Sequence, residues 1–215
     1  KLASPKFITN WDKLMLHFDK PRFLITNEDL TTIGQMLPAL ELAARSGDPL
    51  IIIAEEISGE ALASLIANSE RGTLKVAALS IIKYGQEKQN ILADLATATG
   101  ATFFDRLSGR KINDENNPIK LTDFGSASFI ETQGMLTTIV GGKGDIDAIE
   151  RRKEELQADI EASDDDEEGE KIFERITRLS SAIAIIKVGG GTEAEVNEKK
   201  DRIEDALEAV RSAQE

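Results

Sequence analysis

The sequence contains no cysteine among its 215 residues, which excludes disulfide frameworks and zinc sites built on thiolates. His17 is its only histidine, so a multi-histidine metal site is excluded as well, and a Ser-His-Asp triad would depend on that single residue. Residues 14–18 are typical of a strand or turn, and we predict that His17 is a surface or edge-strand histidine. We therefore predict no metal site.

Long apolar runs are also missing. None reaches the roughly 18 residues that span a bilayer, and the first residues contain no signal-peptide core. The chain starts on Lys1 instead of methionine and stops on Glu215 within a helical pattern, so we expect a piece of a longer protein.

With 26 Lys and Arg residues against 39 Asp and Glu residues, the formal net charge is −13, which repels a phosphate backbone. These observations predict neither a membrane nor a nucleic-acid partner.

The order of apolar segments in the first hundred residues predicts an α/β fold with a partly parallel sheet. Apolar runs of strand length alternate with segments whose apolar residues recur at helical spacing, as at Leu30, Ile33 and Leu37. Asn27 is a fair N-cap for the first helix, and Pro38 within it marks a kink or a first turn. The predicted strands are residues 23–26, 50–54 and 74–79, and the predicted helices are residues 29–45, 59–71 and 88–99.

The rest of the chain changes in character. Short strand-like pieces predict a second sheet layer, and two charged helices joined by an acidic turn predict a helical hairpin. A further strand leads to a last helix capped by Thr192, with Glu195 three residues on. The strands are residues 102–104, 127–131, 137–140 and 182–188, and the charged helices are residues 145–162 and 170–179. The predicted fold class is thus α/β, with mixed sheets flanked by helices and a helical C-terminal segment.

Two glycine turns and one acidic run invite a catalytic or metal-binding interpretation. The turns at residues 141–144 and 189–191 each lie between a strand and a helix, as a phosphate loop does, but Lys143 is followed by Gly144 and the P-loop pattern fails. The acidic residues 164–168 are contiguous, whereas an EF-hand alternates its carboxylates around a mid-loop glycine. We interpret them as flexible turns and a solvated tip. A small α/β nucleotide-binding enzyme that uses the turn at Gly141 or at Gly189 is the alternative function.

Two of the predicted helices carry apolar residues that have two interpretations. Leu37 and Leu40 lie on the first helix, and Leu62 and Ile66 lie on the second. Periodicity alone favours a closed core, in which case the chain is a scaffold. An apolar groove open between the helices would instead bind a strand or helix of a partner, with little demand on its sequence.

Stretches along nearly the whole chain share one pattern in order and spacing. Among them are Gln-Met-Leu-Pro-Ala-Leu-Glu at residues 35–41, Pro-Leu-Ile-Ile-Ile-Ala-Glu at 49–55, Gly-Glu-Ala-Leu-Ala-Ser-Leu at 59–65 and Arg-Ile-Glu-Asp-Ala-Leu at 202–207. They resemble the apical domain of GroEL-type group I chaperonins, followed by part of the intermediate domain. The resemblance implies an apical polypeptide-binding domain at residues 1–180 and the descending part of the intermediate domain at residues 181–215.

The resemblance also implies a groove that captures non-native polypeptide and the mobile loop of a GroES-type co-chaperonin. Lys6 stands where the family has a tyrosine and places a charge in an otherwise apolar wall. The matching residues are Leu2 and Phe7 in an underlying segment, Leu37 and Leu40 on the first helix, and Leu62, Ile66, Ala67 and Asn68 on the second.

For a full-length protein, the resemblance implies a homo-oligomeric ring that uses ATP and Mg²⁺ to assist protein folding. Asp205 matches the aspartate that orients the water attacking ATP. The phosphate-binding loop and the Mg²⁺ ligand belong to an equatorial domain outside these residues. We therefore expect no cofactor, no ATP hydrolysis and no ring from residues 1–215 alone.

Two departures from the family pattern indicate a divergent member. The glycine pair at the hinge reads Ser180-Ser181, and the proline-glycine-aromatic-glycine loop reads Ile82-Lys83-Tyr84-Gly85. Serine has less backbone freedom than glycine, so the apical movement is expected to differ. The implied location is the cytoplasm, or an organellar matrix, or the host cytoplasm if the protein is viral.

Overall fold

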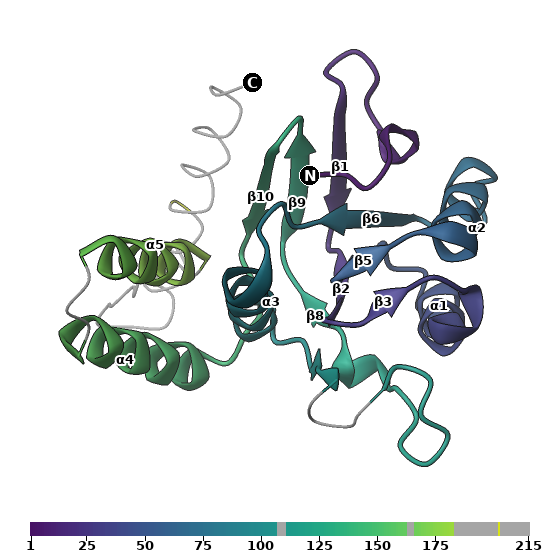
Figure 1. The fold of residues 1–215 in the computed structure, drawn as a ribbon. Helices are drawn as coiled ribbons and strands as arrows, with labels where there is room; N and C mark the ends of the chain where they lie inside the picture. The colour runs from purple at the N-terminus through teal and green to yellow at the C-terminus, as the bar shows by residue number, and fades with distance from the viewer. Residues whose placement is uncertain (107–110, 163–165, 183–201, 203–215) are drawn as a thin grey trace. The chain divides into compact units, whose positions relative to one another are not determined.

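The computed structural model describes residues 1–106, 111–162, 166–182 and 202. The chain divides into two compact units, Lys1–Ile183 and Ala184–Glu215, and the named strands and helices all belong to the first (Figure 1). The assignment of the two parts to an apical domain and an intermediate-domain segment stays a prediction.

A five-stranded sheet forms the centre of the first unit. Its strands run in the order β6-β4-β2-β7, and β8 also pairs with β2. The pairs β2–β4, β4–β6 and β2–β7 are parallel, which confirms the predicted α/β fold with a partly parallel sheet. The strands are β2 (Arg22–Thr26), β4 (Leu50–Ala54), β6 (Val76–Ser80), β7 (Phe103–Phe104) and β8 (Gly125–Ser126).

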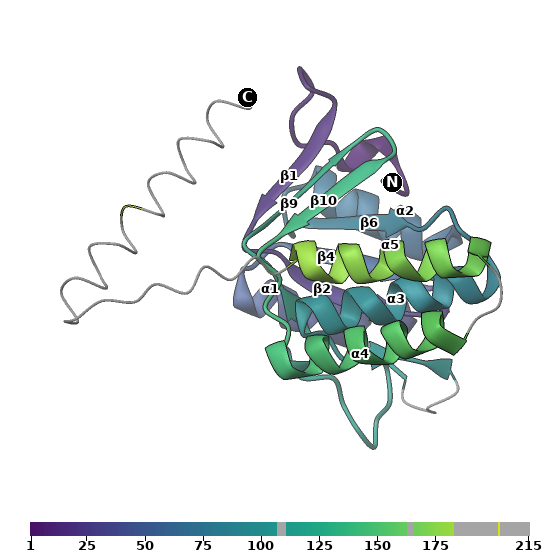
Figure 2. The ribbon, with the colours of Figure 1, turned by 90° about the vertical axis from the view of Figure 1, so that its left-hand side faces the viewer.

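Strand β4 is buried along its whole length, because it lies between two strands and helices cover both faces of the sheet. Helix α3 (Gly85–Thr99) lies on one side with α4 (Ile146–Ala162) and α5 (Asp166–Ala182), while α1 (Leu37–Ser46) and α2 (Gly59–Glu70) lie on the other (Figures 1 and 2). A strand without a polar face needs such a double cover. The continuous run Leu-Ile-Ile-Ile-Ala therefore indicated its central position correctly.

A second sheet accounts for the strand-like pieces in the middle of the sequence. It has three antiparallel strands in the order β1-β9-β10, with bounds Met15–Asp19, Phe129–Gln133 and Leu136–Val140. His17 lies on the edge strand β1, as predicted. Its Nδ1 is 3.0 Å from a carboxylate oxygen of Glu131, the residue opposite it on β9.

Helices α4 and α5 pack against one another and against α3, as the predicted hairpin requires. They bury a second apolar cluster that contains Ala98 of α3, Ile149 and Leu156 of α4, and Ile172 and Leu179 of α5. Asp94 of α3 connects the three helices of this layer. It accepts two hydrogen bonds from Arg175 of α5, at 2.7 and 3.1 Å, and one from Arg152 of α4 at 3.3 Å.

The predicted helix at residues 29–45 is wrong in its first half. Asp29–Leu30 is a short strand, β3, that pairs with β5 (Glu56–Ile57), and Ile33–Gln35 is a 3-10 turn. The Gln35 side chain closes this turn by accepting from the Thr31 and Thr32 N–H groups at 2.8 and 3.0 Å. Helix α1 begins only at Leu37, which places Pro38 in the first turn, where a missing N–H costs nothing.

The remaining predictions lie at or beyond the end of α5. The strand at residues 182–188, the glycine turn at 189–191 and the helix capped by Thr192 lie outside the described residues, except that residue 182 ends α5 and residue 202 is helical. In the part of the chain that the structure describes, no helix has both the length and the apolar character to cross a membrane.

Candidate functional site

Helix α1 presents one exposed leucine beside a buried row. Ala39, Leu40 and Ala43 belong to the core, whereas the Leu37 side chain is 45% exposed. Gly47 ends the helix with φ of 75°, a left-handed conformation that favours glycine. The helix thus buries the face that periodicity indicated and leaves Leu37 at its N-terminal end open to a partner.

Helix α2 has a fully buried row and a half-buried row. Ala61 and Leu65 are buried against the sheet. Leu62, Ile66 and Ala67 are half-buried, and Leu62 and Ile66 pack at the margin of the core. Residues one position apart on a helix differ in direction by about 100°. The half-buried row therefore forms an apolar flank, of which part remains accessible to solvent.

Asn68 lies on the same helix but already has partners. Its amide donates to the Ser64 carbonyl at 2.9 Å, and its amide oxygen accepts from the Thr73 hydroxyl at 3.1 Å. The first bond lies within α2, and the second ties the end of α2 to the loop that follows. A partner that bonded to the Asn68 side chain would compete with them.

The underlying segment runs along the edge of the central sheet. Leu2 forms an antiparallel bridge with Leu79 of β6, and the 3-10 helix η1 (Pro5–Phe7) contacts both β6 and α2. Lys6 places its Nζ 2.8 Å from a carboxylate oxygen of Glu70 on α2, and this hydrogen bond raises the pKa of Lys6. The charge of Lys6, which stands where the family has a tyrosine, is thus balanced by the Glu70 carboxylate.

The structure narrows the set of residues that a partner could touch. Phe7 is 1% exposed and Leu40 is 6% exposed, because both pack into the main core. They can support the surface from beneath but offer almost no area to a partner. Asp205 lies outside the described residues. The predicted residues with accessible surface are Leu2, Leu37, Leu62, Ile66, Ala67 and Asn68.

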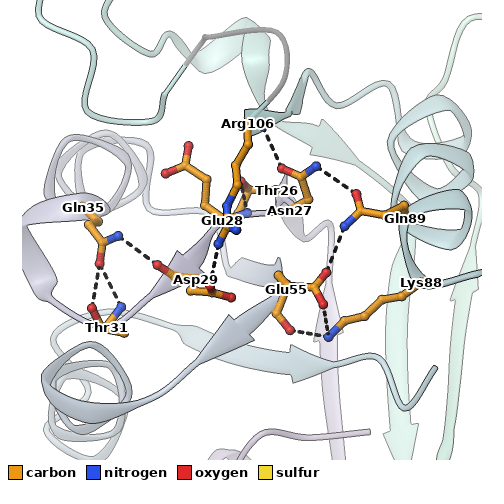
Figure 3. A network of polar contacts seen from close by, with 10 residues as sticks. All are labelled: Thr26, Asn27, Glu28, Asp29, Thr31, Gln35, Glu55, Lys88, Gln89 and Arg106. Atoms are coloured by element: carbon orange, nitrogen blue, oxygen red, sulfur yellow. Dashed lines mark hydrogen bonds and ion pairs between the residues drawn. The ribbon is translucent and has the colours of Figure 1, made fainter. Parts of the chain in front are cut away.

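A polar network that the sequence analysis missed lies at the carboxyl ends of β2 and β4 (Figure 3). The Asn27 amide nitrogen donates to Gln89 of α3 at 2.8 Å and to Asp105 at 2.6 Å. Asn27 therefore anchors α3 to the sheet and does not cap a helix. Polar residues placed directly after two buried strands were the available signal.

The same network holds a buried cation and an acid with an unpaired oxygen. Lys88 of α3 is buried, and its Nζ lies 3.0 Å from a carboxylate oxygen of Glu55 and also donates to the Glu55 carbonyl. Among the described residues, no hydrogen-bond partner reaches Glu28 Oε1, and burial raises the pKa of Glu28. No group of three metal-ligating side chains occurs in the described ranges. Since most of its polar groups bond to one another, the network fits a structural role.

The glycine run at residues 141–144 packs closely against the end of α3. A Cβ on Gly142 would lie 2.3 Å from the Ala98 carbonyl oxygen, and one on Gly144 would lie 2.1 Å from the Thr97 carbonyl oxygen. The Gly144 N–H donates to Ala98 O at 3.1 Å. The carbonyl oxygens of Thr97 and Ala98 lie directly beside this glycine run, where they would repel a phosphate and occupy its space. The run is a close-packing segment, and its geometry does not favour nucleotide binding at the Gly141 turn. The Gly189 turn of the same alternative lies outside the described residues.

Comparisons with known proteins agree with this architecture. No family model matches the chain. The chaperonin GroEL proteins of Wolbachia sp. subsp. Drosophila simulans (strain wRi), Wolbachia pipientis wMel and Wolbachia sp. subsp. Brugia malayi (strain TRS) are each 44% identical to it over 212 residues. The aligned region covers 98% of this chain and 38% of each relative.

The mixed sheets, their helical cover and this identity together define a chaperonin fold. More narrowly, the chain belongs to the GroEL-type group I chaperonins. It spans 38% of the length of the curated relatives that it matches.

Proposed function

We propose that the chain is the polypeptide-binding part of a chaperone, with an apical domain at residues 1–180 and a descending intermediate-domain segment at residues 181–215. One observation carries the proposal. The residues that match the binding helices of the family leave apolar side chains accessible, with Leu37 exposed and Leu62 and Ile66 half-buried. In a chain of this family, accessible leucine and isoleucine side chains on neighbouring elements support a binding surface.

Binding of a non-native polypeptide to this surface would be driven by apolar burial. Each square ångström removed from water contributes about 25 cal/mol, whatever the exact order of the client's residues. Phe7 and Leu40 stiffen the surface from beneath because both lie in the core. The Lys6–Glu70 ion pair keeps opposite charges together at its margin. These features suit clients that share apolar character but no common sequence.

Charge placed on the flank of α2 tests this proposal. Leu62→Glu combined with Ile66→Glu is expected to weaken binding of a permanently unfolded client by roughly tenfold or more, since a bound client would bury both carboxylates without partners. Fluorescence titration measures the affinity, and circular dichroism checks the fold. Ala63→Glu adds a charge to an exposed position of the same helix and should bind as the unsubstituted chain does. Equal affinity in all three chains would refute the α2 site.

The activities of a full-length protein belong to the same proposal. They comprise an ATP- and Mg²⁺-dependent homo-oligomeric ring, a GroES-type co-chaperonin as partner, a cytoplasmic or organellar location, and a role for Asp205 in ATP hydrolysis. Since the phosphate-binding loop and the Mg²⁺ ligand of the family lie outside these residues, residues 1–215 alone should release no phosphate from ATP above background. A steady phosphate-release assay with Mg²⁺ measures this, and turnover that survives repurification would contradict it.

A further inference from the structure

Four large apolar side chains gather at one end of the β1-β9-β10 sheet, away from the residues that the family resemblance names. Trp11, Leu14, Met135 and Leu136 are between 58% and 70% exposed. We call these four residues the apolar tip. Each is more exposed than Leu37, which is 45% exposed. The apolar tip is therefore more accessible to solvent than the apolar side chains of α1 and α2.

Backbone pairing brings the four residues together from two parts of the sequence. Asn10 and Met15 form an antiparallel bridge that closes the loop of residues 11–14, and Met15 pairs with Gln133 of β9. The Gln133 amide donates to the Lys13 carbonyl at 2.9 Å. The turn at residues 134–135 joins β9 to β10, and Leu136 lies opposite Gln133. Figure 1 shows both turns at the same end of the sheet.

Leu14 is held in a backbone conformation that leucine seldom adopts. Its φ is 50°, in the left-handed region where glycine and asparagine are the usual residues. The loop fixes this geometry through the Asn10 side chain, which accepts from Lys13 N at 3.0 Å, and through Met15 N, which donates to Asn10 O at 3.0 Å. Glycine would suit the backbone better, and the Leu14 side chain is 58% exposed. Strain combined with exposure points to a functional role for the side chain.

We propose that the apolar tip is a second contact site for apolar segments of the same non-native polypeptides. This inference rests on the proposed function. The loop comes directly after η1 in the sequence, and η1 packs on α2, so the tip and the underlying segment belong to one stretch of chain. A net charge of −13 opposes adsorption to an anionic membrane. Four partly exposed side chains offer less than the roughly 800 Å² per partner of a stable dimer. An unfolded apolar segment needs neither a large interface nor a particular charge.

Trp11 provides a direct test, because it is the only tryptophan of the chain. The probe is a tryptophan-free polypeptide kept unfolded by reduction and carboxymethylation. Its addition should shift the Trp11 emission to shorter wavelength in a saturable manner. Leu14→Gly removes the apolar side chain and relieves the backbone, so it should weaken client binding by about threefold or more without lowering the midpoint of thermal unfolding. A role in folding alone would leave the affinity unchanged.

Two further variants complete the test. Met135→Ser added to Leu14→Gly should weaken binding further, whereas Phe173→Ser, at an exposed position of α5, should leave it unchanged. An unshifted Trp11 emission with client bound, or full affinity in the double variant, overturns the inference. The inference is also overturned if phosphatidylcholine vesicles or self-association of the chain shift the Trp11 emission as much as the unfolded polypeptide does, and the double variant loses that shift.

The tip and the α2 surface can fail separately. If Leu62→Glu with Ile66→Glu binds normally and the tip variants do not, the α2 site is refuted and the tip stands. If only the α2 variant loses binding, the tip is refuted and the proposed function stands.

Discussion

Replacing Asp94 by alanine is expected to lower the free energy of unfolding by about 3–5 kcal/mol, the usual cost of breaking a buried ion pair. Asp94 and Arg175 are both buried, and two hydrogen bonds join them at 2.7 and 3.1 Å. Without the carboxylate, the Arg175 guanidinium stays in the interior with no anion beside it. Arg152 loses the same partner. Because Asp94 connects α3 to both α4 and α5, the loss should loosen the whole helical layer.

Urea unfolding followed by circular dichroism measures this effect, and two matched variants serve as controls. Asp159→Ala removes an exposed acid from α4 and should change stability by less than about 0.5 kcal/mol. Asp94→Leu combined with Arg175→Leu removes both charges and should recover much of the loss, since apolar replacements of a buried pair are often tolerated. If Asp94→Ala proves no more costly than Asp159→Ala, the ion pair does not hold the layer together.

The sequence predicted the central elements well because local patterns determine them. The run at residues 50–54 has no polar face, so it had to be a covered strand, and β4 has the predicted bounds. The first half of the helix at residues 29–45 failed for the opposite reason. Its apolar spacing is helical, but β3 pairs with β5 and the Gln35 side chain closes a turn. Pairing with a distant segment overrode the local pattern.

The sequence alone did not show which distant residues come into contact. Asp94 and Arg175 are 81 positions apart, and either one alone reads as a charged residue on a helix surface. The network around Asn27 joins two strand ends, α3 and residues 105–106 in the same way. Residue types after a strand can suggest such a site, but only the folded chain shows which of them meet.

The candidate binding surface was predicted in composition but not in exposure. Periodicity shows which face of α1 or α2 is apolar, but whether another segment covers that face depends on the tertiary structure. The structure distributes the predicted residues accordingly, with Phe7 and Leu40 in the core and Leu37 exposed. The apolar tip escaped sequence analysis because its residues come from a loop and a turn, where no periodicity marks a shared face.

The glycine run gives the second large effect, since Gly144→Ala should lower the free energy of unfolding by about 3 kcal/mol. The new Cβ would lie 2.1 Å from Thr97 O and 2.8 Å from Ala98 O. Both are backbone atoms at the end of α3, which cannot rotate away as a side-chain end can. Relief of the contact requires the segment to withdraw, which breaks the bond from Gly144 N to Ala98 O.

Gly169→Ala is the matched control, because it makes the same substitution in α5 at a site where a Cβ meets nothing within 4 Å. It should stabilise the chain by up to about 1 kcal/mol, since alanine favours a helix over glycine. Thermal unfolding should therefore move in opposite directions for the two variants. A neutral Gly144→Ala would mean that residues 141–144 form the free turn expected from sequence, with space beside them for a ligand. A large loss would mean that these glycines serve the packing of α3 and leave no room for a phosphate.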